Sequence, residues 1–323
     1  MSLVQLSIKD KAAGFRKYVT ARLEGRLYSI TLELTRRCNA KCDYCGHWRE
    51  PHRHELDAAG WVDVVRRFDP LNVTLCGGEP LIRPDAVDIA RAVKHLPGWR
   101  YLSIITNGWF LDERRAGALL DAGMDQINVS LNWPDERHDA ERKLKGLFGR
   151  IRAIVPWLAG QGANVQLNSI LMKDNLDQVL PLAHLAESWG AKITFTLYSE
   201  LPAANRTHLF PPELLPKLES VCEELRRLRA RGVVANEDWY LERAPRYAAG
   251  EKIGGCTAGK RTIHITPAGL VRPCAELPTI THYRDYDPAK QPWTTCQACF
   301  QACRGEVQAP ITPARVVGYL TGH

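Results

Sequence analysis

Three cysteines lie within eight positions in the stretch LELTRRCNAKCDYCGHW, residues 32–48, as Cys38, Cys42 and Cys45. A structural zinc site uses four ligands and disulfides form in pairs, so three neighbouring thiols predict another use. Thiolates hold iron–sulfur clusters, and three of them can hold three irons of a [4Fe–4S] cube while the fourth iron stays open to a ligand. A zinc site completed by His47 or by a distant residue is the alternative.

The bulk properties indicate where these thiols work. The N-terminus, MSLVQLSIKDKAAGF, is charged early and lacks an apolar core, so it is not a signal peptide, and no apolar run is long enough to span a bilayer. We therefore expect a cytoplasmic protein, in which clustered thiols are metal ligands or catalytic groups. The net charge of +7 is spread along the chain. It favours anionic ligands or an acidic electron-donor protein, and no nucleic acid is expected.

Short β-rich runs alternate with amphipathic helical stretches over most of the chain. Six such units predict an α/β fold, a partial (β/α)6 TIM-like barrel over residues 28–235 with a capping helix over residues 1–27. In such barrels the chemistry lies at the C-terminal ends of the strands. Beyond residue 240 we expect a hairpin turning at Pro267-Ala268-Gly269 and a Cys-rich tail. The candidate strands are 27–34, 72–76, 101–106, 126–131, 164–171 and 192–198.

Polar motifs follow these strands in order. The cysteine triplet, with Tyr44 before its last member, follows the first, Gly77-Gly78-Glu79-Pro80 the second, Thr106-Asn107-Gly108 the third and Ser130-Leu131-Asn132 the fourth. Taken together they resemble the radical S-adenosylmethionine (SAM) superfamily over about residues 28–200. The resemblance implies a [4Fe–4S] cluster on the triplet that reduces SAM. The 5′-deoxyadenosyl radical so formed abstracts a hydrogen atom from substrate, and a flavodoxin- or ferredoxin-type protein supplies the electron.

The resemblance also implies a set of cofactor contacts. The GGE motif would bind the methionine amino group of SAM, where glycine lets bare backbone approach the ligand. Strand-end groups would face the ribose and the carboxylate. The implied cofactor-binding residues are Tyr44, Gly77, Gly78, Glu79, Asn107, Ser130, Arg142 and Asn168.

A second group of cysteines lies in residues 236–323. Its spacing resembles the C-terminal extension called SPASM or, in its short form, twitch, which carries auxiliary iron–sulfur clusters. The expected ligands of one auxiliary [4Fe–4S] cluster are Cys256, Cys274, Cys296 and Cys299, and Cys303 could replace either of the last two. A zinc ribbon is the alternative.

Other residues are candidates for substrate chemistry. Cys303 or Cys76 could donate a hydrogen atom to a substrate radical, and Glu200 and Arg206 lie in a long polar loop placed to touch substrate. The histidines at 47, 52, 54 and 208 are expected to have no role beyond the surface or the support of the site. Cys222 is expected to pack as a small hydrophobe.

Superfamily membership does not fix the substrate. Because only about 27 residues precede the first strand, we expect a small polar biosynthetic intermediate, such as a sugar, a nucleoside or another natural-product precursor, anionic ones included. The reaction would be oxidation, elimination or epimerisation assisted by the auxiliary cluster. The alternative is a peptide- or protein-modifying enzyme. A non-catalytic iron–sulfur or zinc module is the third reading, and the GGEP series argues against it.

Overall fold

A computed structural model describes residues 8–49, 54–291 and 294–312. Within them a nine-stranded sheet has the order β6-β5-β4-β3-β2-β1-β7-β8-β9. Strands β1 to β7 run parallel and the last two are antiparallel. The strands are β1 Ser29–Thr35, β2 Asn72–Gly77, β3 Tyr101–Thr106, β4 Gln126–Ser130, β5 Val165–Leu171, β6 Lys192–Leu197, β7 Thr262–Ile265, β8 Leu270–Arg272 and β9 Thr281–His282.

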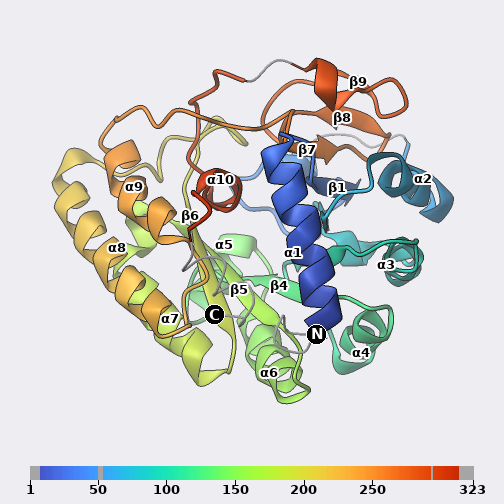
Figure 1. Ribbon diagram of the computed structural model, residues 1–323. Helices are drawn as coiled ribbons and strands as arrows, with labels where there is room; N and C mark the ends of the chain where they lie inside the picture. Colours follow the sequence, from blue (N-terminus) through green and yellow to red (C-terminus); the bar gives the residue numbers. More distant parts are fainter. Residues whose placement is uncertain (1–7, 50–53, 292–293, 313–323) are drawn as a thin grey trace.

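Helices follow most strands and pack on the outside of the curved sheet (Figure 1). The α-helices are α1 Ile8–Leu23, α2 Ala58–Phe68, α3 Ala86–Lys94, α4 Glu113–Asp121, α5 Arg137–Arg142, α6 Leu147–Gly160, α7 Val179–Ser188, α8 Leu215–Ala230, α9 Asp238–Ala248 and α10 Ala302–Gln308. Short 3-10 helices are η2 His47–Arg49, η3 Pro80–Ile82, η4 Lys173–Gln178, η5 Pro212–Leu214 and η6 Pro288–Lys290. The six predicted strand–helix units are confirmed. No α-helix of the described residues is long and apolar enough to cross a membrane.

The two faces of the sheet differ in chemistry. The helix-facing residues, such as Ile30, Leu32 and Val73, are fully buried in one core with Trp61 of α2. Alternate residues point to the other face, because side chains alternate along a strand. That face is polar, with Ser103 donating to Thr74 over 3.1 Å and Gln166 donating to Asn128 and Asn168. The barrel interior is therefore a polar surface and not a second apolar core.

Helix α1 covers the N-terminal ends of the strands. Lys17 pairs with Asp69 at 2.8 Å and donates to the carbonyls of Pro70 and Trp99, which precede β2 and β3. Arg22 donates to the carbonyl of Val307 at 2.6 Å, so α1 and α10 lie side by side (Figure 1). The predicted capping helix is present from residue 8, and residues 1–7 lie outside the described part of the chain. The opposite end of the sheet is left for the motifs.

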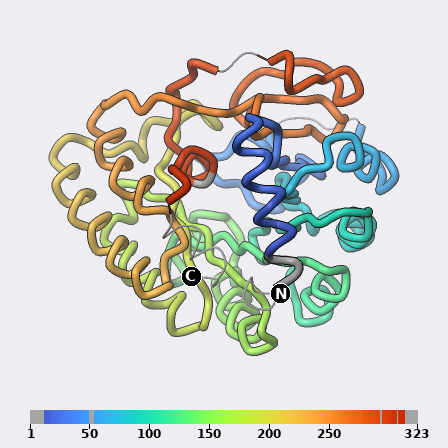
Figure 2. Tube along the Cα trace, viewed as in Figure 1, coloured from blue at the N-terminus to red at the C-terminus, as the bar shows by residue number. Residues whose placement is uncertain are grey.

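The C-terminal part continues the same sheet. After α9 the chain returns to the far edge of β1, as Figure 2 shows, and β7 pairs with β1 in parallel register, with His264 opposite Thr31. The predicted hairpin is present as β7 and β8. The predicted boundary at residue 235 lies before α9 and remains a prediction.

Candidate active site

The cysteine triplet lies in the loop that follows β1. Cys42 and Tyr44 are buried in a small apolar cluster with Met172 and Tyr198, and Cys38 and Cys45 pack against it. The Trp48 indole donates to the carbonyl of Cys42 over 3.0 Å, which closes the loop behind the thiols. Burial raises the pKa of the Cys38 thiol to about 12 and also raises that of Cys45. These thiols therefore stay protonated at neutral pH until a metal displaces the protons.

Arg142, the last residue of α5, reaches this loop from the side. Its Nη1 atom lies 3.6 Å from Sγ of Cys42, and its guanidinium carbon lies 5.7 Å from the centre of the Tyr44 ring. The Tyr44 hydroxyl donates to Glu141 over 3.0 Å, and the Asn132 side chain donates to both. The predicted contact residues Tyr44 and Arg142 thus meet at one thiol.

The GGE motif lies against the start of the cysteine loop. The backbone N–H of Gly78 donates to the carbonyl of Thr35 and that of Glu79 to the carbonyl of Arg37, over 2.7 and 2.8 Å. A Cβ atom at Gly77 would lie 2.3 Å from the carbonyl oxygen of Thr35, and one at Gly78 would lie 2.5 Å from those of Arg36 and Arg37. Both glycines are needed for close backbone packing, whatever they bind.

Glu79 and Asn107 join the second and third strand ends. The fully buried Glu79 carboxylate accepts from the Thr106 hydroxyl and from the Asn107 backbone N–H, each at 2.7 Å. Burial raises the pKa of Glu79. The Asn107 side chain donates to Asn39, the residue after Cys38, over 2.9 Å. Ser130 and Asn168 are register partners on β4 and β5. The predicted SAM contacts therefore follow one another across the ends of adjacent strands.

The described residues around the triplet fit an iron–sulfur cluster with a polar ligand. Two buried donors there, Asn39 Nδ2 and Arg142 Nε, have no hydrogen-bond partner among the residues that the structure describes. Asn39 follows Cys38 in the chain and Arg142 contacts Cys42, so both donors belong to the surroundings of the thiols. Within residues 8–49, 54–291 and 294–312, no three His, Cys, Asp or Glu side chains are placed to hold a single metal ion.

The thiols of the tail also gather. Cys256 precedes β7, Cys274 follows β8, and Cys299 and Cys303 flank the start of α10. Burial raises the pKa of Cys299 to about 11, and the nearby thiols Cys274 and Cys256 add to this increase. These two thiols and Cys299 also disfavour ionisation of Cys303. Cys303 is thus one of the gathered thiols, whereas the backbone N–H of Cys296, another predicted ligand, donates to Thr294.

A small cavity of about 70 Å³ is lined by residues of the cysteine loop, of β5 and β6, and of the tail. Its wall runs from Tyr44, next to Cys45, across the end of β6 to Gln301, between Cys299 and Cys303. The N–H of Ala302 donates to Thr196 on β6 over 2.9 Å, which fixes the tail to the barrel. The tail thus borders the barrel interior.

The two predicted substrate residues lie in the loop after β6, which also supplies Ser199 and Pro202 to the wall of the small cavity. Glu200 and Arg206 form an ion pair at 3.2 Å in the loop after β6, and the Arg206 side chain is 76% exposed. The same loop contacts the cysteine loop through His208, which lies 3.2 Å from Asp43 and 2.6 Å from Asp174. His208, for which the sequence predicts no specific role, therefore connects the loop to the site.

A buried charge cluster was also missed. Glu33 on β1 is fully buried, and its carboxylate lies 2.8 Å from His47 Nδ1, 3.2 Å from His264 Nε2 and 3.2 Å from Arg36. Burial alone would raise the pKa of Glu33, but the hydrogen bonds to both histidines hold it well below its usual range. Cys76 is the register partner of Glu33, and burial and this carboxylate raise the pKa of its thiol. An acidic residue inside an otherwise apolar strand, LELT, was the available signal.

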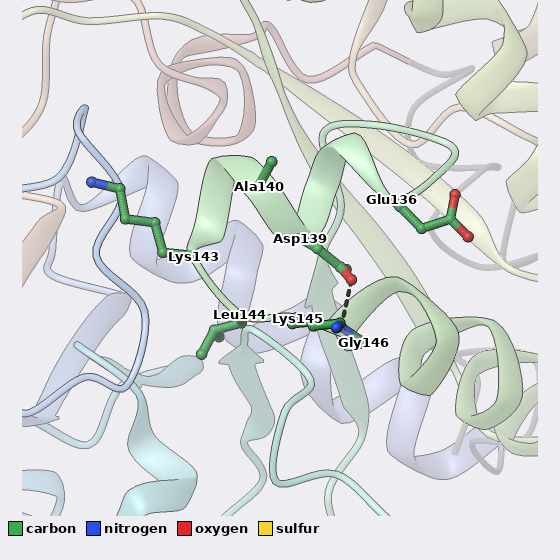
Figure 3. A pocket seen from close by; sticks show the side chains of 7 residues that line it. All are labelled: Glu136, Asp139, Ala140, Lys143, Leu144, Lys145 and Gly146. Atoms are coloured by element: carbon green, nitrogen blue, oxygen red, sulfur yellow. Dashed lines mark hydrogen bonds between the residues drawn. The ribbon is translucent and has the colours of Figure 1, made fainter.

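A wider groove of about 620 Å³ lies along α5 and the turn into α6. Figure 3 shows the Asp139 carboxylate directed at the N–H of Gly146, while Glu136 and Lys143 point away to opposite sides. No strand residue lines this groove among those described. Leu144, which lines the groove, also packs against the apolar cluster of Cys42 and Tyr44, so the groove adjoins the cysteine loop.

Known proteins match this arrangement. The model of the radical SAM superfamily matches residues 32–186. The chain belongs to this superfamily. It is 33% identical over 293 residues to the PqqA peptide cyclase of Methylobacterium nodulans, with 85% of this chain and 75% of the relative covered. The enzyme of the same name from Gluconobacter oxydans is 32% identical, with 76% and 69% covered. The structure of Streptococcus suis SuiB bound to precursor peptide SuiA superposes with a TM-score of 0.67 at 18% identity, covering 85% and 67%.

Membership establishes the cofactors of this radical SAM protein, a [4Fe–4S] cluster and SAM. The relatives also overturn one expectation. A small polar metabolite as substrate and partner is wrong, because these relatives are named for a peptide. The reason is physical: the strand-end motifs bind a cofactor that all members share, so they carry no information about the substrate. The length before the first strand was not a valid guide.

One prediction tests the glycine packing. Gly78→Ala should destabilise the apoprotein by about 2–3 kcal/mol, since backbone carbonyls cannot move aside for the new methyl group. Urea unfolding measures this cost, and iron bound after reconstitution should fall with it. Gly117→Ala on α4, where nothing lies within 4 Å, is the control and should be neutral or stabilising. Equal effects of the two variants would contradict the prediction.

Proposed function

We propose that this radical SAM protein modifies a peptide by forming a bond between two of its side chains. The observation that carries the proposal is the 33% identity to a PqqA peptide cyclase across 85% of this chain. When bound, the cluster and SAM supply abstraction of a hydrogen atom from an unactivated carbon. The chain's residues have to place the peptide, exclude water and accept the proton that leaves, and the electron that leaves with this proton would pass to a bound iron–sulfur cluster.

The polar inner face supports a peptide substrate. Its hydroxyl and amide side chains, on β2 to β5, can exchange hydrogen bonds with a peptide backbone. We assign Cys38, Cys42 and Cys45 as the cluster ligands. We assign to SAM the predicted contacts Tyr44, Gly77, Gly78, Glu79, Asn107, Ser130, Arg142 and Asn168.

A direct assay tests the function. Anaerobically reconstituted protein would be reduced in the presence of SAM with synthetic PqqA of Methylobacterium nodulans and with peptides from short reading frames beside the gene. A new intramolecular bond removes two hydrogens, so mass spectrometry should show one peptide lighter by two hydrogens, with 5′-deoxyadenosine formed in step. The proposal would be contradicted if every peptide stayed unmodified and SAM were cleaved at the same rate with and without peptide.

We further propose that Cys256, Cys274, Cys299 and Cys303 hold an auxiliary cluster. The electrostatic contacts of Cys274, Cys299 and Cys303 with one another and with Cys256 support this set. Two [4Fe–4S] clusters require about eight irons per chain. Cys256→Ala with Cys274→Ala should remove about half of them.

Single variants separate the two ligand sets. Cys303→Ala should lower the iron content and Cys296→Ala should leave it at the wild-type level, by elemental analysis of reconstituted protein. If Cys296→Ala lowered the iron content and Cys303→Ala did not, the ligand set predicted from the sequence, which contains Cys296, would be the right one. If the elemental analysis found zinc in a stoichiometric amount, the tail would be a zinc ribbon and would hold no auxiliary cluster.

A further inference from the structure

Asn132 is fully buried just after β4, and both ends of its amide are in use. Its Nδ2 atom donates to the Tyr44 hydroxyl over 3.0 Å and to Glu141 over 2.8 Å. Its Oδ1 atom accepts from the N–H of Ile170 on β5 over 3.0 Å. The position needs one donor and one acceptor, which an amide provides and a carboxylate does not.

Glu141 receives this donor and two others. Its carboxylate accepts from the Tyr44 hydroxyl over 3.0 Å and from the Trp133 indole over 3.1 Å. Its side chain is only 13% exposed, and its Oε2 atom lies 3.8 Å from Arg142. These hydrogen bonds hold the negative charge of Glu141 next to the guanidinium of Arg142, the residue that contacts Cys42.

The four side chains form one connected path. Asn132 fixes Glu141 and Tyr44, and these two flank the guanidinium of Arg142. Arg142 in turn lies 3.6 Å from Sγ of Cys42. Since Arg142 is buried on several sides, its direction depends on these neighbours.

We propose that Asn132 and Glu141 are a pair of positioning residues that hold Tyr44 and Arg142 against the cysteine loop and so set the affinity for SAM. The inference uses the cofactor and not the peptide substrate, so it can fail or stand independently of the proposed function. The two residues must match in charge. One has to be neutral and donate while the other is anionic and accepts.

Exchanging the amide at position 132 with the carboxylate at position 141 tests whether the two residues must be one donor and one acceptor. Asn132→Asp would place a second carboxylate where Nδ2 now lies 2.8 Å from Glu141, and two buried carboxylates at that distance cannot both stay ionised. Glu141→Gln in the same chain would restore a donor–acceptor pair with the roles reversed. The carboxylate introduced at position 132 could still accept from the N–H of Ile170 and would accept from the Tyr44 hydroxyl.

The measurement is the dissociation constant for SAM, by equilibrium dialysis of oxidised, reconstituted protein, with iron content and melting temperature of the same samples. Asn132→Asp should weaken binding about tenfold, whereas the double variant should bind within about threefold of wild type, a coupling in the range measured for contacting polar pairs. Glu136→Gln, an exposed glutamate of the same segment, is the matched control and should bind SAM as wild type does.

Several outcomes would overturn the proposal. One is a double variant whose dissociation constant for SAM is raised by the product of the factors measured for the two single variants, because the two residues would then act independently. Another is an Asn132→Asp protein with a lower melting temperature and an unchanged dissociation constant, which would show a structural role alone. If Asn132→Asp does not fold, Glu141→Gln is compared with the double variant. The proposal then requires the double variant to bind SAM at least as tightly.

Discussion

Cleavage of SAM should stop when Cys38, Cys42 and Cys45 are replaced together by alanine. The three thiols lie in one loop, with Arg142 in contact with Cys42, so replacing all three removes every proposed ligand of the cluster that binds SAM. Formation of 5′-deoxyadenosine in the presence of dithionite should fall to background, a loss of at least about a thousandfold for an enzyme of ordinary turnover.

The same variant should keep the visible absorption of the tail cluster. A matched control is Cys222→Ala, because Cys222 is a buried core residue of α8 far along the chain from both thiol groups. That control should cleave SAM at nearly the wild-type rate. Undiminished cleavage by the triple variant would refute the assignment of the loop.

Glu33→Gln should give the second large effect, a loss of about 3–5 kcal/mol in the free energy of unfolding at pH 7. Removal of one partner from a buried ion pair leaves the others uncompensated, and Glu33 contacts His47, His264 and Arg36 with no exposed area. Glu24→Gln, from an exposed pair with Arg26, is the control and should change stability by less than about 1 kcal/mol.

The contribution of Glu33 to the free energy of unfolding should depend on pH, and the direction of this dependence follows from its pKa. The pKa of Glu33 is lower in the folded protein than in the unfolded chain, where it is about 4.3. Ionised Glu33 therefore stabilises the fold fully above that value, and the contribution is lost as the pH falls below it. Urea unfolding from pH 7 to pH 3 should show the difference between wild type and Glu33→Gln shrinking in acid. A constant difference would contradict the linkage.

The six parallel strands could be predicted because their signals are local. Each strand is a short β-rich run, and each is followed by a helix whose apolar face repeats along a few turns. The Cys38 spacing and the GGEP motif are local in the same sense. Their meeting at one edge follows from the topology of a parallel sheet.

The contacts that the sequence did not reveal join distant residues. His264 is 231 positions from Glu33, and nothing near either residue indicates the pairing. The same holds for Asn132 and Tyr44, which are 88 positions apart. Glu200 and Arg206, six positions apart in one loop, pair with each other, and their predicted contact with substrate stays a prediction. The role of such a side chain depends on the residue that it contacts, and that contact is determined by the tertiary structure.

The parallel pairing of β7 with β1 has a consequence for the order of synthesis. β2 covers one side of β1 after some forty residues, but the other side waits for β7, which leaves the ribosome more than two hundred residues after β1. Contacts so distant in sequence form late, because a long loop must close first. Until then β1 is an edge strand, and Glu33 lacks the imidazole of His264. The nascent cysteine loop thus rests on an unfinished support until β7 has been made and has paired with β1, and iron should be inserted only after that pairing.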